Sequence, residues 1–190
     1  MADLAIMLVN KLRGRDTYAP LTGPAARPQP VPPLDARGAS IELRRLRTLE
    51  PSTRELVVSV LAWARENGIP AVLGETHRSE AEQARHAREG RTGIPEGQTG
   101  WHQYGRAWHF VIVDPETKLL DEPAYARVAA EVRRRGGDWL GDRPLKTTRG
   151  MVQDLAHFEY HPGLKLSSFR KTPQARKELA LAERRAARYG

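Results

Sequence analysis

The sequence contains no cysteine among its 190 residues. Without cysteine, neither a disulfide framework nor a metal site built on thiolates can form. Any metal site must therefore use His, Asp or Glu side chains as ligands. A chain of this length can still bury a sizeable hydrophobic core without covalent cross-links.

Long apolar runs are also missing, since no stretch reaches the roughly 18 apolar residues that a membrane span needs. Residues 1–10 are largely apolar, but the first Lys and Arg follow this short run instead of preceding it. We therefore expect no membrane span and no signal peptide, and a protein that is made in the cytoplasm. If its substrate lies outside the cytoplasm, another component has to export it.

Acidic residues are in deficit, with 23 Asp and Glu against 31 Lys and Arg, a formal net charge of +8 and a pI near 10.2. This balance predicts an anionic partner or surface, either nucleic acid or the bacterial wall with its carboxylates and polymer phosphates. An arginine-rich composition without a specific partner is the alternative. Nucleic acid is the least favoured partner, because the basic residues are scattered and no reading motif is present.

The two ends of the chain differ in composition from its middle. Six prolines and two glycines fall within residues 19–38, which predicts an extended arm or linker. Residues 3–13 could form a short amphipathic helix or a frayed terminus, and 173–189 read as a basic helix. The expected division is 1–40 for the apolar segment and proline-rich arm, 41–165 for one globular domain, and 166–190 for the basic C-terminal helix.

The middle of the chain alternates between helical and strand patterns. Ser79 and Glu82 have the spacing of a capping box at a helix N-terminus. Apolar residues at helical spacing and short β-branched or aromatic runs mark the other elements. We expect helices over 51–67, 80–88 and 122–135, and strands over 69–74, 107–114 and 158–161. Separated helices with short strands predict an α+β domain.

The histidines are the residues that carry the clearest chemical signal. His102 and His109 are seven residues apart, and Asp154 lies three residues before His157. Three imidazoles can occupy three corners of a tetrahedral zinc site, which leaves the fourth corner to water. A nearby carboxylate, here Asp154, can act as the general base for that water. Spacing alone leaves open that these are ordinary surface or core histidines.

The order of motifs along the chain favours metal ligands over ordinary histidines. In sequence order they are Thr76-His77-Arg78-Ser79-Glu80-Ala81-Glu82-Gln83, Gly90-Arg91-Thr92, His102-x-x-Gly105-x-Ala107-x-His109, Gly136-Gly137-Asp138-Trp139 and Asp154-x-x-His157-Phe158-Glu159. This series resembles the VanY-like D-alanyl-D-alanine carboxypeptidase and L-alanyl-D-glutamate endopeptidase family, which includes phage endolysins. The resemblance covers about residues 45–162. It implies a zinc peptidase with a small antiparallel sheet and flanking helices, of the hedgehog/DD-peptidase-like type.

The resemblance also implies roles for residues around the metal. Arg78 would hold the scissile carbonyl oxygen or a substrate carboxylate, because its fixed charge suits an oxygen that becomes negative. Gln83 would support that site, and Trp139 and Asp142 would lie at the substrate cleft. For Arg78 the alternative is a surface ion pair with Glu80 or Glu82. For Trp139 and Asp142 the alternative is packing in the fold, which is favoured for Trp139.

Two positions depart from the family pattern. His109 stands where the family has an aspartate ligand, and Gly100 stands where it usually has a serine. A third imidazole keeps zinc binding possible but removes one negative charge from the ligand set, which should make the bound water more acidic. The larger ring could also point away from the metal, so an active, an inactive or an empty site all remain open.

The sequence therefore favours a zinc-dependent peptidase that cuts the peptide stems of peptidoglycan, as an L-Ala-D-Glu endopeptidase or a D,D-carboxypeptidase. The Gly90-Arg91-Thr92 motif and the small size favour the endopeptidase type. The alternative is a weakened or inactive wall-binding or structural subunit of a phage-like particle, since a shared fold does not fix function. In either case the N-terminal arm and the C-terminal helix could attach the protein to other subunits of a virion or similar particle.

Overall fold

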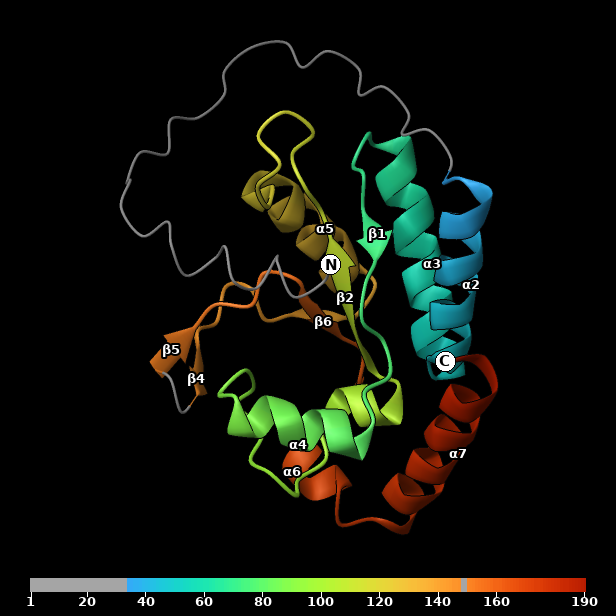
Figure 1. The fold of residues 1–190 in the computed structure, drawn as a ribbon, viewed down its shortest axis with the longest axis vertical. Coiled ribbons are helices and arrows are strands. Elements are labelled where there is room, and N and C mark those ends of the chain that lie inside the picture. The colour runs from blue at the N-terminus through green and yellow to red at the C-terminus, as the bar shows by residue number, and fades with distance from the viewer. Residues whose placement is uncertain (1–33, 148–149) are drawn as a thin grey trace.

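In a computed structural model of the chain, residues 34–147 and 150–190 are described, and helices alternate with short strands along them (Figure 1). The helices are α2 (Ala36–Thr48), α3 (Pro51–Glu66), α4 (Glu80–Arg88), α5 (Glu122–Arg134), α6 (Leu166–Phe169) and α7 (Pro173–Tyr189), with a 3-10 turn η1 (Trp101–Tyr104). The strands are β1 (Val72–Leu73), β2 (Ala107–Val111), β3 (Asp138–Trp139), β4 (Leu145–Thr147), β5 (Gly150–Val152) and β6 (His157–Glu159). The α+β class is confirmed.

A four-stranded sheet in the order β1-β2-β6-β3 forms the centre, and each of its pairs is antiparallel. The register of β2 with β6 places Trp108 opposite Phe158 and His109 opposite His157. Because successive side chains of a strand point to opposite faces, the aromatic pair and the histidine pair lie on different faces of the sheet. Strands β4 and β5 form a separate hairpin.

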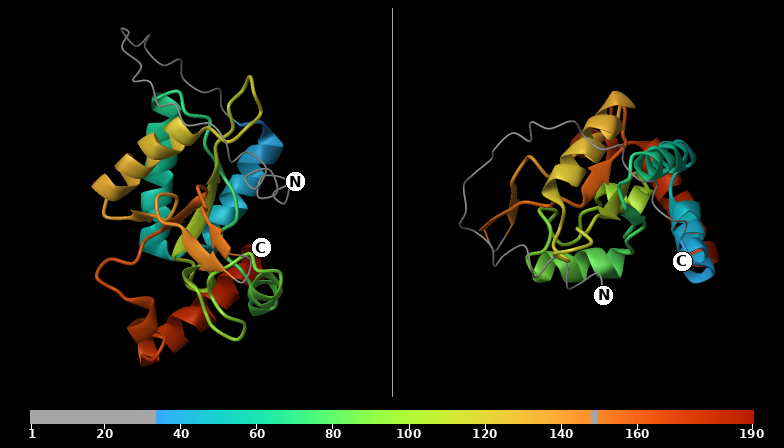
Figure 2. Two further views of the ribbon diagram at one scale, coloured as in Figure 1. Left: turned by 90° about the vertical axis from the view of Figure 1, so that its left-hand side faces the viewer. Right: turned by 90° about the horizontal axis from the view of Figure 1, so that it is seen from above.

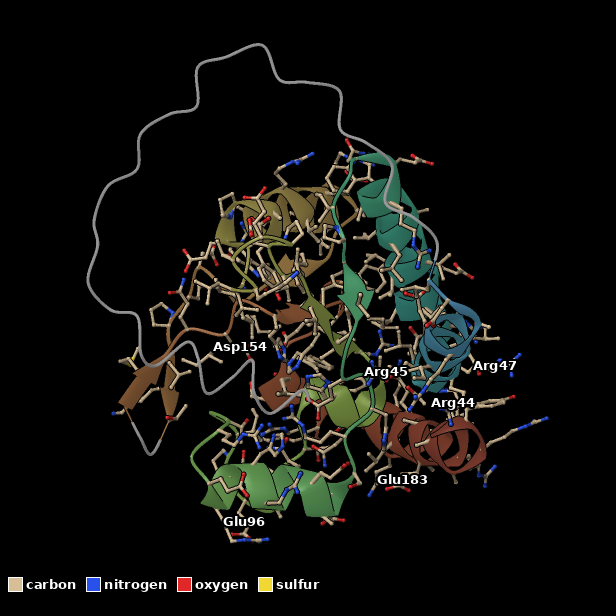
Figure 3. The ribbon with its side chains drawn as sticks, turned by 45° about the horizontal axis from the view of Figure 1, so that its top comes forward. Arg44, Arg45, Arg47, Glu96, Asp154 and Glu183 are labelled. Atoms are coloured by element: carbon tan, nitrogen blue, oxygen red, sulfur yellow. The ribbon has the colours of Figure 1, made fainter. Side chains whose placement is uncertain are left out.

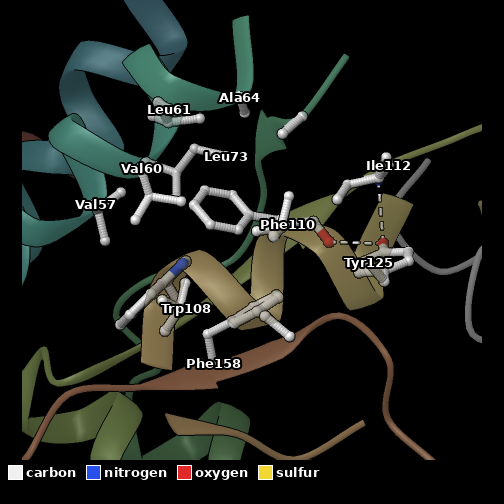
Figure 4. Close-up of a cluster of buried hydrophobic side chains, with 14 of the residues drawn as sticks. Val57, Val60, Leu61, Ala64, Leu73, Trp108, Phe110, Ile112, Tyr125 and Phe158 are labelled. Carbon is white, nitrogen blue, oxygen red and sulfur yellow. Dashed lines mark hydrogen bonds between the residues drawn. The ribbon is translucent and has the colours of Figure 1, made fainter. Parts of the chain in front are cut away.

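The aromatic face of the sheet meets the hydrophobic core (Figure 4). Trp108, Phe110 and Phe158 are fully buried and contact one another through their rings. Val57, Val60 and Leu61 of α3 belong to the same cluster. On α5, the hydroxyl of Tyr125 donates to Phe110 O at 2.8 Å and accepts from Ile112 N at 3.1 Å. These contacts hold β2 rigidly, so the opposite face of the strand can present His109 in a fixed place.

A second, smaller core joins the C-terminal region to the turn η1. Trp101 and Tyr104 pack with Phe169 and with Ala175 of α7. Helix α7 also packs along α2, so that the first and last described helices lie side by side, with α3 next to α2 (Figures 1 and 2). The region 166–190, expected as a terminal basic helix, is thus packed onto the part of the chain that carries His102.

The expected helices match the structure to within about one residue at their ends, including the capping box of Ser79 and Glu82. The expected strands are present but shorter. Helix α2 was not expected, and it begins at Ala36 and crosses the boundary placed at residue 41. The segment 3–13 and most of the arm at 19–38 lie outside the described residues. Every helix in the described part of the chain is too short or too polar to span a bilayer.

Candidate metal centre

Three histidines from three separate elements come together on the face of the sheet away from the core. His102 comes from η1, His109 from β2 and His157 from β6. Each offers one ring nitrogen, and these nitrogens all lie within 4.8 Å of one another. The cross-strand register brings His109 and His157 together. The turn η1 places the centre of the His102 ring 4.9 Å from the centre of each of their rings. The structure thus unites the three residues predicted as metal ligands into a group that could hold a metal ion.

The ring of His102 is oriented by a backbone carbonyl. Its Nδ1 lies 2.6 Å from Thr76 O, so Nδ1 carries the proton and Nε2 carries the lone pair. This Nε2 is buried and has no hydrogen-bond partner within the described residues. Burial, together with the nearby Arg78 guanidinium, holds the pKa of His102 well below its usual range. A neutral imidazole with an unpartnered buried lone pair is suited to bind a metal ion.

The ring of His157 is oriented in the same manner by a carboxylate. Its Nε2 lies 2.9 Å from Glu159 Oε1, so the lone pair is on Nδ1. Glu159 also accepts from Nε2 of His161 at 2.9 Å, and the His161 ring stacks on Trp101. Burial would raise the pKa of Glu159, but the two imidazole hydrogen bonds outweigh it and lower the pKa to about 2.

His109 completes the group. Its Nε2 is 3.2 Å from Nδ1 of His157. The same nitrogen is 3.8 Å from Oδ2 of Asp154, and Figure 3 labels this aspartate. Burial lowers the pKa of His109 to about 4, although the Asp154 carboxylate favours the charged form. Two neutral imidazoles that face each other through lone pairs repel unless a cation or a proton lies between them. The donor set, with the unpartnered Nε2 of His102, fits a divalent metal that prefers imidazole ligands.

Asp154 lies beside the histidine cluster, as expected for a general base. Its side chain is about one-third exposed, and the residue precedes β6 on the segment that leads to His157. A carboxylate that reaches the cluster from the solvent side can exchange a proton with water bound there. The structure therefore brings together four of the predicted site residues, His102, His109, His157 and Asp154.

Arg78 and Gln83 are linked to the cluster through Glu75. Arg78 donates from Nε to Glu75 Oε1 at 2.9 Å, from Nη2 to Glu75 Oε2, and from Nη1 to Gln83 Oε1 at 3.1 Å. The Arg78 side chain is only 7% exposed. Burial would raise the pKa of Glu75, but the hydrogen bonds from Arg78 outweigh it and hold that pKa well below its usual range. Substrate contact by Arg78 or Gln83 remains a prediction.

Trp139 and Asp142 have other partners. Trp139 pairs with Phe158 in the sheet, so it faces the hydrophobic core instead of the histidines, and its Nε1 donates to Leu155 O at 2.8 Å. Asp142 pairs with Arg133 at 2.6 Å. The packing alternative for Trp139 agrees with these contacts, and a substrate role for either residue remains a prediction.

Three residues of the site were not anticipated, namely Glu75, Thr76 and Glu159. Each orients or approaches a histidine from outside the ligand set. Glu159 and Thr76 stand inside the motifs of the resemblance, and Glu75 directly precedes one. Their positions could have drawn attention, but the contacts themselves depend on the tertiary fold.

No protein-family model matches this sequence, and no curated protein matches it either. Among solved structures, the chain is similar to the Serratia marcescens L-Ala D-Glu endopeptidase ChiX, with a TM-score of 0.49 and 24% sequence identity. The match covers 63% of this chain and 86% of that one. Similarity of this size does not transfer a function, so an assignment has to rest on the residues of the site.

Proposed function

We propose that this protein is a zinc-dependent peptidase that hydrolyses the peptide stems of peptidoglycan. The observation that carries the proposal is the convergence of His102, His109 and His157 with the Asp154 carboxylate beside them. The ordered motifs around these residues support the substrate class, because they resemble those of wall-cutting peptidases.

The donor set supports zinc as the metal. Three neutral imidazoles are a known ligand set for catalytic Zn²⁺, which keeps a fourth position open. When bound, the ion would supply Lewis-acid activation of a water molecule and of the scissile carbonyl. The residues that would hold it are His102 through Nε2, His109 through Nε2 and His157 through Nδ1.

The chain's own residues account for the movement of protons. Asp154 accepts a proton from the attacking water, whose hydroxide oxygen forms a bond to the carbonyl carbon of the stem peptide. The same carboxyl group then gives the proton to the amine as the C–N bond breaks. The second proton of the water leaves the new carboxylic acid and is taken up by the amine. The products are therefore a carboxylate and an ammonium group, and Asp154 returns to its ionised state.

The substrate is a stem peptide cut either between L-Ala and D-Glu or at its D-Ala end. The Gly90-Arg91-Thr92 motif favours the endopeptidase reaction. The protein would act on the bacterial cell wall, as a component of a phage or a phage-like particle that delivers it there. The high positive charge would favour its retention on the anionic wall.

Metal analysis combined with wall digestion tests the proposal. The parent and Asp154→Asn should each contain one zinc per chain, whereas His109→Ala and His157→Ala should not. Only the parent should digest purified wall at full rate, with Asp154→Asn slower by about 10²–10⁴-fold because the general base is lost.

Two outcomes would contradict the proposal. If the parent takes up no zinc even when zinc is offered in excess, the protein is not a zinc peptidase. The remaining function is that of a wall-binding or structural subunit of a particle. An Asp154→Asn variant that digests wall as fast as the parent would refute the role of that carboxylate. Mass analysis of the released fragments decides which bond is cut.

A further inference from the structure

The carboxylate of Glu75 lies at the Nδ1 side of the His109 ring, whereas the Nε2 side of that ring faces His157. Glu75 Oε2 lies 3.6 Å from Nδ1 of His109, while Nε2 of the same ring lies 3.2 Å from Nδ1 of His157. The two nitrogens of one imidazole thus face two different partners. Because a neutral imidazole carries one proton, these partners compete to decide which nitrogen holds it.

Glu75 is itself held in place by Arg78. The guanidinium binds both carboxylate oxygens of Glu75, through Nε and Nη2, and its Nη1 is bound to Gln83 Oε1. Paired donors of this kind fix the plane of a carboxylate as well as its position. Gln83 is 2% exposed and sits on α4, so the orientation of Glu75 is tied to a helix.

We propose that Glu75, held by Arg78, is the positioning residue for His109 in the proposed metal site. Its negative charge favours the proton on Nδ1, which leaves the lone pair of Nε2 directed at the metal. At 3.6 Å the contact is longer than a hydrogen bond, so the effect is electrostatic attraction in a largely buried setting. Arg78 then acts on the proposed metal site through Glu75.

The need for such a residue follows from the histidine at position 109. Nδ1 of His157 is an acceptor, because the opposite nitrogen of that ring is bound to Glu159. If Nε2 of His109 carried the proton, it would donate a hydrogen bond to Nδ1 of His157. Neither of these two nitrogens could then bind a metal ion. A carboxylate at this position would have no tautomers, whereas His109 has two. The negative charge of Glu75 disfavours the tautomer with the proton on Nε2, which cannot bind the metal.

Zinc affinity, measured by competition with a chromophoric chelator, tests the inference, which rests on the proposed function. Glu75→Gln should weaken zinc binding by about 10–100-fold, the usual effect of losing a partner of a metal-bound histidine. The amide of the new side chain can donate to Nδ1 and so favours the blocked tautomer. Glu75→Asp, which restores the charge, should recover part of the affinity.

Glu131→Gln is the matched control. Glu131 is also buried and also binds arginine side chains, Arg134 and Arg135, but it lies on α5 within a separate ion cluster. This variant should lose stability and keep the zinc affinity of the parent. Equal losses of affinity in Glu131→Gln and Glu75→Gln would show a general effect of destabilisation and overturn the inference.

The tautomer of His109 separates the two possible roles of Glu75, because it would not change if Glu75 only stabilised the fold. In metal-free protein at pH 8, the imidazole ¹⁵N shifts should show more proton on Nδ1 in the parent than in Glu75→Gln. Arg78→Ala should weaken zinc binding too, and the double variant with Glu75→Ala should bind zinc no more weakly than Glu75→Ala alone.

Three results would overturn the inference. The first is an unchanged zinc affinity in folded Glu75→Gln, and the second is an unchanged His109 tautomer in that variant. The third is a loss of zinc affinity in the double variant of Arg78→Ala and Glu75→Ala that equals the sum of the two single losses. If the parent binds zinc and Glu75→Gln binds it equally well, only this inference fails. If the parent binds no zinc, the proposed function fails with it.

Discussion

At the scale of single residues, a buried carboxylate on α5 links protonation to stability. Hydrogen bonds from Arg134, and then from Arg135, lower the pKa of Glu131 to about 2, although burial opposes the shift. A carboxyl group with a lowered folded pKa stabilises the fold above its unfolded pKa of about 4.5, and this contribution is lost as the pH falls toward 2. Glu131→Gln should therefore be less stable than the parent at pH 7, and the gap should narrow below pH 4.5.

Urea denaturation of both proteins at pH 7, 4.5 and 3.5 measures this gap. Glu75 and Glu159 also have lowered pKa values, so the parent should lose stability in acid by more than Glu131 alone explains. A gap between the two proteins that stays constant across this range would show that Glu131 is not the titrating group.

Some residues of the site can be recognised from sequence motifs, whereas others come close to the histidines only through the tertiary fold. The convergence of His102, His109, Asp154 and His157 could be predicted, because all four stand in the ordered motifs that carry the family resemblance and their residue types suit a metal site. Glu75 could not be assigned a role in the same way, since it meets His109 only after β1 and β2 have paired. Tautomers depend on such partners, so sequence patterns name ligands more readily than the groups that orient them.

At the scale of elements, the turn between η1 and β2 fixes the spacing of the first two histidines. Gly105 has φ +71°, and a Cβ there would lie 2.9 Å from Glu50 N and 3.0 Å from Thr48 O. Gly97 has a similar φ of +77° with nothing within 4 Å. Gly97→Ala should cost about 1–2 kcal/mol from the left-handed backbone alone. Gly105→Ala should cost roughly 1–3 kcal/mol more, because backbone atoms cannot yield.

Thermal and urea unfolding of the two variants measure these costs. Gly105→Ala should also weaken zinc binding, since the displaced turn carries His102, whereas Gly97→Ala should not. Equal stability of the two alanine variants would mean that the junction of α2 and α3 accommodates the methyl group, and that the close approach has no energetic weight.

Helix α2 shows where sequence patterns for elements fail. Its neighbour α3 has a continuous apolar stripe and was predicted, whereas α2 alternates leucines with arginines directly after a proline-rich segment. Its stability comes from tertiary contacts, such as the Glu42–Arg65 ion pair at 2.6 Å and the bond from Arg185 Nε to Thr48 O at 3.3 Å. Local propensity carries little information about a short helix that is stabilised mainly by packing.

At the scale of the whole molecule, the C-terminal helix has two faces with different roles. The side chain of Arg106, which directly precedes β2, is 10% exposed and donates to Glu178 of α7 at 2.9 and 3.0 Å. The neighbouring residue Lys177 is exposed on the outer side. The inner face thus joins α7 to the segment between His102 and His109, and the outer face leaves basic residues available to a partner.

Alanine substitutions at these two adjacent positions separate the roles. Glu178→Ala should destabilise the protein by roughly 3 kcal/mol, because it leaves the buried Arg106 guanidinium without its main partner. Lys177→Ala should change stability by less than about 0.5 kcal/mol, as is usual at exposed sites. Urea denaturation measures the stability of both variants. Zinc affinity should fall only in Glu178→Ala, because Arg106 directly follows the turn that sets the spacing of His102 and His109. If Glu178→Ala proved as stable as Lys177→Ala, α7 would be an appendage for docking and not a structural part of the domain that carries the three histidines.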